Sequence, residues 1–134
     1  MTRGYGYWIF TVLLALWLVP SGAFDLLRIR AVLEILQRLG YPSYVAPILG
    51  TGKLLAISAI FYPRTRILRE WAYAGITFLL VGAFLSHCVV HDPVTVMAAS
   101  VLVLGFAAGS YLLRPAQYRL QGRPQAGQAG DISA

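Results

Sequence analysis

Four apolar stretches constrain this chain more than any other feature of its sequence. They cover residues 4–24, 39–63, 71–91 and 93–113, and the only Asp, Glu, Lys or Arg within them is Lys53. About 20 apolar residues in a helix cross the ~30 Å hydrocarbon core of a bilayer, so each stretch can span it. Because the chain has only 134 residues, we expect one all-α domain, an integral membrane four-helix bundle in contact with the lipid bilayer.

The distribution of charge supports a membrane protein and gives its orientation. Charged residues make up 12% of the chain, whereas a soluble domain has about 25%. The net charge of +6 comes from arginines at the ends of the spans, a pattern that does not indicate nucleic-acid binding. The side that holds both termini and the second loop carries Arg3, Arg64, Arg66, Arg69, Arg114, Arg119 and Arg123. The other side carries Arg28, Arg30 and Arg38. The positive-inside rule therefore predicts a bacterial-type inner-membrane protein with both termini in the cytoplasm.

The segment between the first two spans predicts a short amphipathic helix. Apolar and charged residues recur at helical spacing over residues 25–39, which favours a helix that lies on the outer membrane face or caps the bundle. Gly40 and Pro42 are expected to end this helix, and Pro20 is expected to kink or end the first span. The first span resembles a signal peptide in position, but residues 19–24 form a poor cleavage site, so we expect it to be retained.

Small residues recur at helical spacing in the later spans, and they predict close helix packing. They are Gly50, Gly52, Ala56, Ala59, Ala72, Gly75, Gly82, Ser86, Gly105 and Gly109. This pattern is compatible with a homo-oligomer. Residues 63–66 are expected to form a tight basic turn. The folded domain is expected to cover residues 1–114, followed by a disordered cytoplasmic tail over 115–134, which is rich in Gln, Gly and Ala.

Lys53, the only lysine, stands near the middle of the second span. At ~1.5 Å per residue it lies about 13 Å from either end of that helix. A charge at such depth needs a partner, a wet cavity or the loss of its proton. Lys53 either pairs with a polar group and fixes the bundle, or forms a site that binds a quinone carbonyl, binds an anionic substrate or donates a proton.

His87 and His91 are four residues apart and share one face of a continuous helix. Two histidines need further ligands to hold a metal, and the nearest candidates are Cys88, Asp92 and Asp25. The spacing matches no recognised zinc or haem pattern. We therefore expect no metal site, and histidines that bond loop carbonyls at the membrane surface.

Two acidic residues stand at the ends of spans. Asp25 follows the first span, and we expect it to cap the amphipathic helix or to contact His87. Glu70 begins the third span, where it complements the helix dipole and is expected to pair with Arg66 or Arg69.

The sequence does not decide whether the protein is an enzyme. It contains no phosphate loop, nucleophile elbow or dinucleotide fingerprint. Its single cysteine, Cys88, excludes an internal disulfide framework. Tyr41, Tyr44, Trp71 and Tyr73 either line a pocket for a planar ligand or form interfacial belts.

Several stretches resemble the DoxX-like family of small four-span membrane proteins. They are Gly-Tyr-Pro at 40–42, Ile-Leu-Gly-Thr-Gly-Lys-Leu-Leu at 48–55, Arg-Glu-Trp-Ala-Tyr-Ala-Gly at 69–75 and Gly-Ala-Phe-Leu-Ser-His at 82–87. The resemblance covers about residues 20–113. The positions that match the family are Lys53, Glu70, Trp71, Tyr73, Ser86 and His87. They imply a polar path through the bundle, with His87 outside, Lys53 midway and Glu70 inside.

The function implied by this resemblance is a membrane subunit that works with a quinone or a redox partner. The family takes its name from a subunit associated with thiosulfate:quinone oxidoreduction, and relatives have been linked to maturation and oxidative-stress complexes. Lys53 and His87 would then contact a ligand or carry protons. Two alternatives stay open: a non-catalytic accessory protein of a larger membrane complex, and a small transporter, which four spans would form only as an oligomer.

Overall fold

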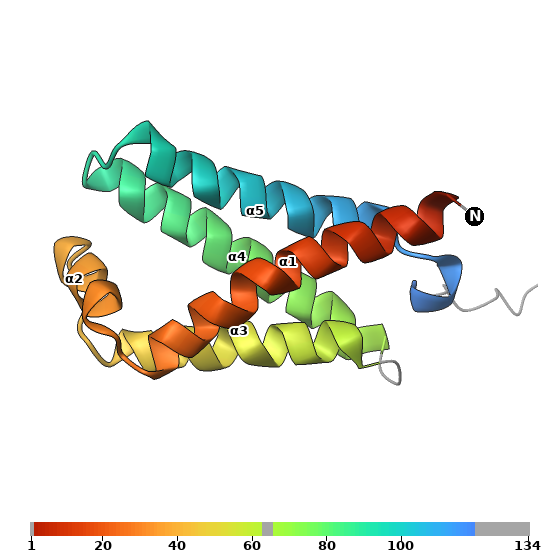
Figure 1. Ribbon diagram of the computed structural model, residues 1–134, viewed down its shortest axis with the longest axis horizontal. Helices are drawn as coiled ribbons and strands as arrows, with labels where there is room; N and C mark the ends of the chain where they lie inside the picture. Colours follow the sequence, from red (N-terminus) through yellow and green to blue (C-terminus); the bar gives the residue numbers. More distant parts are fainter. Residues whose placement is uncertain (1, 63–65, 120–134) are drawn as a thin grey trace, which may run out of the picture.

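The computed structural model describes residues 2–62 and 66–119, and within them the protein is all-helical. Its elements are α1 (Thr2–Leu26), α2 (Arg30–Arg38), α3 (Val45–Phe61), α4 (Arg66–Val89), α5 (Val94–Leu112) and a 3₁₀ helix, η1 (Ala116–Tyr118). The four long helices form a ring in which α1 and α4 each pack against α3 and α5. Helix α2 lies at the end of the bundle opposite the N-terminus (Figure 1). The predicted all-α bundle is confirmed.

The lengths and surfaces of these helices suit a membrane. Helices α1, α4 and α5 are long and apolar enough to cross a bilayer, whereas the apolar helix α3 has 17 residues. At about 1.5 Å per residue, α3 is roughly 25 Å long. Large apolar side chains such as Leu16, Trp71, Phe78 and Val101 remain exposed around the bundle. In a bilayer these side chains face lipid.

The boundary between α1 and α2 differs from the prediction. Helix α1 continues through Pro20 to Leu26, so Asp25 lies in its last turn. The N-cap of α2 is Ile29, without a side-chain hydrogen bond, and the predicted capping role of Asp25 is wrong. The physical reason is that the Asp25 carboxylate forms an ion pair with Lys53, as described below. The predicted end of α2 is confirmed, because Gly40 adopts φ 80° just beyond it.

A close backbone contact joins α1 to α3. A Cβ added at Gly50 would lie 2.6 Å from Gly22 O and 2.9 Å from Leu26 N. Only glycine therefore allows the two backbones to approach so closely here. Gly75 and Gly105, in contrast, would meet nothing within 4 Å. Their predicted role in packing inside this bundle is wrong: Gly75 lines an open groove between α3 and α4, and Gly105 is exposed on α5.

Two predicted segments lie partly outside the described residues. The predicted basic turn covers residues 63–66, of which 63–65 lie outside the described residues and Arg66 begins α4. Most of the predicted tail, residues 120–134, also lies outside the described residues. The first residues of that predicted tail do pack against the bundle. The Tyr118 ring lies 5.7 Å from the Tyr7 ring, and the Arg69 guanidinium lies 4.3 Å from the centre of the Tyr118 ring.

Candidate functional site

The charge of Lys53 is neutralised between α1 and α3. Lys53 Nζ lies 2.6 Å from Asp25 Oδ2 and donates a second hydrogen bond to Ser21 Oγ at 2.7 Å. The two charged side chains are 13% and 8% exposed. A buried charge needs a partner, and Asp25 supplies it.

The glycine contact explains why this pair forms. Gly22 stands one helical turn before Asp25 in α1, and Gly50 stands one turn before Lys53 in α3. The close approach of Gly22 and Gly50 brings the two backbones together just beside the pair. The ion pair is therefore fixed by backbone packing as well as by charge.

Lys53 and Asp25 line a cavity of about 330 Å³ beneath α2. Polar residues line it from four helices: Ser21 and Asp25 from α1, Lys53 from α3, His87 from α4 and Ser100 from α5. The rest of the wall is mainly apolar, with contributions from Trp17, Val32, Ile35, Leu36, Leu39, Leu49, Leu80, Val96 and Ala99. A mostly apolar cavity with a few convergent polar groups is typical of a small-molecule site.

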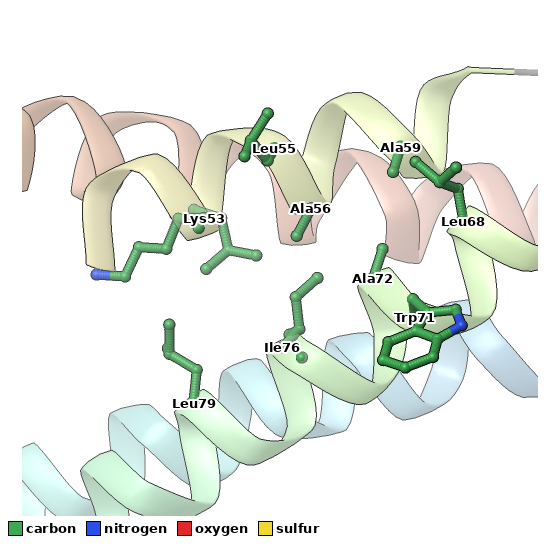
Figure 2. A pocket seen from close by; sticks show the side chains of 12 residues that line it. Lys53, Leu55, Ala56, Ala59, Leu68, Trp71, Ala72, Ile76 and Leu79 are labelled. Carbon is green, nitrogen blue, oxygen red and sulfur yellow. The ribbon is translucent and has the colours of Figure 1, made fainter. Parts of the chain in front are cut away.

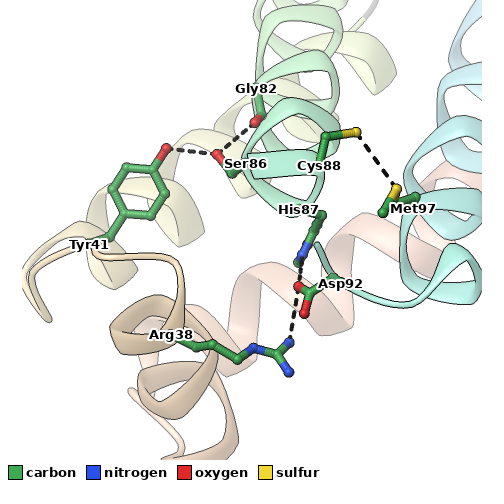
Figure 3. A network of polar contacts seen from close by, with 8 residues as sticks. All are labelled: Arg38, Tyr41, Gly82, Ser86, His87, Cys88, Asp92 and Met97. Atoms are coloured by element: carbon green, nitrogen blue, oxygen red, sulfur yellow. Dashed lines mark hydrogen bonds and ion pairs between the residues drawn. The ribbon is translucent and has the colours of Figure 1, made fainter. Parts of the chain in front are cut away.

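His87 is held by the turn between α4 and α5. Its Nδ1 lies 2.6 Å from Asp92 Oδ2, and Arg38 of α2 donates to the same oxygen at 3.2 Å (Figure 3). The predicted bond from His87 to a loop carbonyl is wrong, because the carboxylate of Asp92 is the nearer acceptor. Ionised Asp92 only accepts, so the hydrogen of a neutral imidazole lies on Nδ1.

Lys53 and His87 both keep hydrogen-bonding capacity at the cavity. An ammonium has three N–H donors, and the described residues accept two of those of Lys53. His87 Nε2 has no hydrogen-bond partner among the described residues, since Nδ1 makes its one bond to Asp92. One donor and one ring nitrogen are therefore left to meet a ligand. The predicted contact between Asp25 and His87 is wrong. Both residues line the cavity, but Asp25 pairs with Lys53 and His87 pairs with Asp92.

Ser86 is next to His87 in sequence but points elsewhere. Its hydroxyl bonds Tyr41 Oη at 2.8 Å and donates to the carbonyl of Gly82 (Figure 3). This contact ties α4 to the segment between α2 and α3. Ser86 therefore helps to hold α2 over the cavity and does not line it.

Glu70 lies at the end of the bundle that holds the N-terminus. It accepts a hydrogen bond from Arg114 at 2.5 Å, and not from the predicted partners Arg66 or Arg69. Arg69 is turned inward, where it donates to the carbonyls of Ile60 and Tyr62 at the end of α3. The structure therefore does not bring Glu70 to the cavity of Lys53 and His87.

Tyr73 belongs to a buried chain of hydroxyl groups. Thr11 donates to the carbonyl of Tyr7 at 2.7 Å, so its oxygen accepts from Ser110 at 2.6 Å. Ser110 has then used its hydrogen, and Tyr73 donates to Ser110 at 2.6 Å. This chain joins α1, α4 and α5 and satisfies each hydroxyl away from the cavity. Tyr73 is thus bonded within the core.

Sequence reasoning missed Ser21 as a partner of Lys53 and underused Asp92. A helical-wheel comparison gives one usable signal for Ser21, since it precedes Asp25 by four residues and shares its face. The sequence predicts a role for Asp92 only as a candidate metal ligand, although a carboxylate five residues after a histidine can also orient the imidazole ring. Within residues 2–62 and 66–119, no three His, Cys, Asp or Glu side chains gather as metal ligands would.

Comparison with known proteins places the chain in a family. The model of the DoxX-like family matches residues 9–110, which include the whole cavity and most of the bundle. The protein is a helical membrane protein of the DoxX-like family. No curated protein and no solved structure matches the chain.

Proposed function

We propose that this protein is a quinone-binding membrane subunit that works with a redox partner, and that the cavity of Lys53, Asp25 and His87 is its site. The observation that carries the proposal is the third N–H donor of Lys53, which no described residue accepts and which lies in a mainly apolar cavity beside a paired carboxylate. A quinone offers carbonyl acceptors on a flat apolar ring, which matches this combination of groups.

The charge balance of the site favours a neutral ligand. Lys53 and Asp25 neutralise each other, so a full anion would have to compete with the Asp25 carboxylate for the same ammonium. A carbonyl needs only the third N–H and leaves the ion pair intact. This comparison supports a quinone over a small anion such as thiosulfate.

His87 supplies the second polar contact of the proposed site. With Nδ1 bonded to Asp92, its Nε2 accepts a hydrogen bond from a quinol hydroxyl. A protonated ring would donate to a quinone carbonyl through the same nitrogen. Quinone and quinol differ by two electrons and two protons. His87 can exchange one of these protons with the ligand, and the redox partner would exchange the electrons. Asp92 and Arg38 connect His87 to the exposed end of the bundle.

The proposal is tested by titrating the purified protein with a benzoquinone without a tail. Trp17 lines the cavity and reports binding by quenching when Trp8 and Trp71 are replaced by phenylalanine. The double variant Lys53→Met, Asp25→Asn removes both charges together. It should weaken binding about tenfold or more, since a charge-assisted hydrogen bond contributes about 1.5–3 kcal/mol. Equal affinity of both proteins would overturn the assignment.

An accessory role is the second candidate, and exposed glycines favour it. Gly82 and Gly105 would meet nothing within 4 Å if they carried a Cβ, so another helix can approach them closely. Gly82→Leu and Gly105→Leu would then release a membrane partner and leave quinone binding unchanged. If both variants instead kept the membrane partner and lost quinone binding, quinone binding would remain the proposed function.

The orientation follows from the arginine distribution and is part of the proposal. We place the chain in an inner membrane, with the α2 end facing outward and both termini in the cytoplasm. A fluorescent reporter fused after Ala134 should fluoresce, and alkaline phosphatase at the same position should be inactive. The opposite pair of results would reverse the proposed orientation.

A further inference from the structure

A second hollow continues from the polar cavity between α3 and α4. It has a volume of about 290 Å³, and Leu18, Lys53 and Leu79 line both hollows. Figure 2 shows Lys53 and Leu79 at one end of this groove and Leu68 and Trp71 at the other. The groove and the cavity therefore meet at Lys53.

The groove is apolar along its length, and small residues leave the space for it between the helices. Among the described residues that line it, Lys53 is the only one with a charged side chain. Small residues of α3 and α4 face one another along it: Gly52, Ala56, Ala59, Ala72 and Gly75. A Cβ at Gly52 or Gly75 would meet nothing within 4 Å. The small side chains at these positions leave the groove open between α3 and α4, which contact each other elsewhere along their lengths.

The outer edge of the groove faces the bilayer. Trp71, Leu55 and Leu68 line it and are 76%, 64% and 54% exposed. Side chains this apolar and this exposed on membrane helices meet lipid chains. The groove is therefore open to the hydrocarbon core along its outer edge, and its inner end meets the polar cavity at Lys53.

We infer that this groove binds the apolar tail of the ligand whose head occupies the Lys53 cavity, and that the ligand enters sideways from the bilayer between α3 and α4. The inference rests on the proposed quinone site. It narrows the ligand class to lipid-soluble quinones with a linear apolar tail. The volume of the cavity, 330 Å³, is at the low end of the roughly 300–1,000 Å³ of ligand sites. It suits a ring-sized head, and the groove provides the room for the tail.

The test fills the groove without touching the polar site. Gly75→Leu places a side chain in the groove where space is free, and Gly105→Leu makes the same change on the outside of α5. The affinity of each protein is measured for a benzoquinone with a decyl tail and for the tail-free benzoquinone. Equilibrium affinity of the tail-free compound does not depend on the groove, so it serves as the internal reference.

We expect Gly75→Leu to weaken binding of the decyl compound about tenfold or more, the effect of overfilling a packed site. Binding of the tail-free compound should stay unchanged, and Gly105→Leu should affect neither. Unchanged decyl binding would show that the tail lies elsewhere, and an equal loss of both compounds would show that the groove does not act on the tail. Both results overturn the inference. Failure of the unsubstituted protein to bind either compound would instead overturn the proposed function.

Discussion

Lys53 Nζ lies 2.6 Å from Asp25 Oδ2, and this ion pair joins the middle of α3 to the last turn of α1. Both side chains are largely buried, yet a donor of Lys53 is unused by the described residues. The pair therefore has two roles in the account proposed here. It holds two helices together and presents a polar group to an apolar cavity.

Lys53→Met alone should destabilise the protein strongly. It leaves the Asp25 carboxylate buried without a counter-charge, and breaking a buried pair in this way costs about 3–5 kcal/mol. Adding Asp25→Asn removes the stranded charge and should restore most of the stability. The measurement is the thermal unfolding midpoint in mild detergent. A single variant as stable as the double variant would show that the pair is not buried as described.

Gly50→Ala should destabilise the bundle where Gly52→Ala does not. A Cβ at Gly50 would meet the backbone of α1 at 2.6 Å, and backbone cannot move aside as a side-chain tip can. Overpacking of this kind costs about 1–3 kcal/mol. Gly52 is in the same helix with nothing within 4 Å, so its substitution is the matched control. The thermal unfolding midpoint of Gly50→Ala should be lower than that of Gly52→Ala. Equal midpoints would contradict the close contact.

Tyr73→Phe should reduce stability by about 1 kcal/mol without changing quinone affinity. The change removes one buried hydrogen bond, the one donated to Ser110, and keeps the ring. Tyr111→Phe is the control, because the Tyr111 hydroxyl has no hydrogen bond among the described residues. Loss of quinone affinity in Tyr73→Phe would mean that Tyr73 contacts the ligand after all.

Asp92→Asn should weaken quinone binding about tenfold, by roughly the strength of one hydrogen bond to a charged group. The substitution removes the carboxylate that fixes the His87 ring, while the shape of the side chain stays the same. Arg38→Gln removes only the outer partner of Asp92. The Arg38 side chain is 54% exposed, so its loss should have a small effect on quinone affinity. Affinities measured by Trp17 quenching separate the two variants. A larger loss in Arg38→Gln would place the main contact on α2 and not on His87.

The sequence predicted the helices well because apolar length and small-residue spacing are local properties. It also singled out Lys53, since a lone charge in a span demands a partner whatever the fold. The identity of that partner depends on how α1 and α3 are aligned, and the Gly22–Gly50 contact that sets this alignment joins positions 28 residues apart. The same limit applies to Glu70, whose partner Arg114 lies 44 residues away. Local reasoning favoured neighbouring arginines there.

The glycines that meet no neighbouring helix among the described residues show a second limit. Gly75 and Gly82 repeat with the spacing of a packing face, but a repeat of small residues does not say whether it meets another helix, lipid or a ligand. Only the arrangement of α3 beside α4 shows that Gly75 lines a groove. That groove could not be predicted from the sequence, because its two walls come from different helices.

The most direct test of the quinone site is mass spectrometry of small molecules that remain bound after purification in mild detergent. The unsubstituted protein and the Lys53→Met, Asp25→Asn variant are compared after both are shown to be folded. The account predicts a tailed quinone in the unsubstituted protein and its loss from the variant. The same quinone in both proteins, or none in the folded unsubstituted protein, would contradict a ligand site at Lys53.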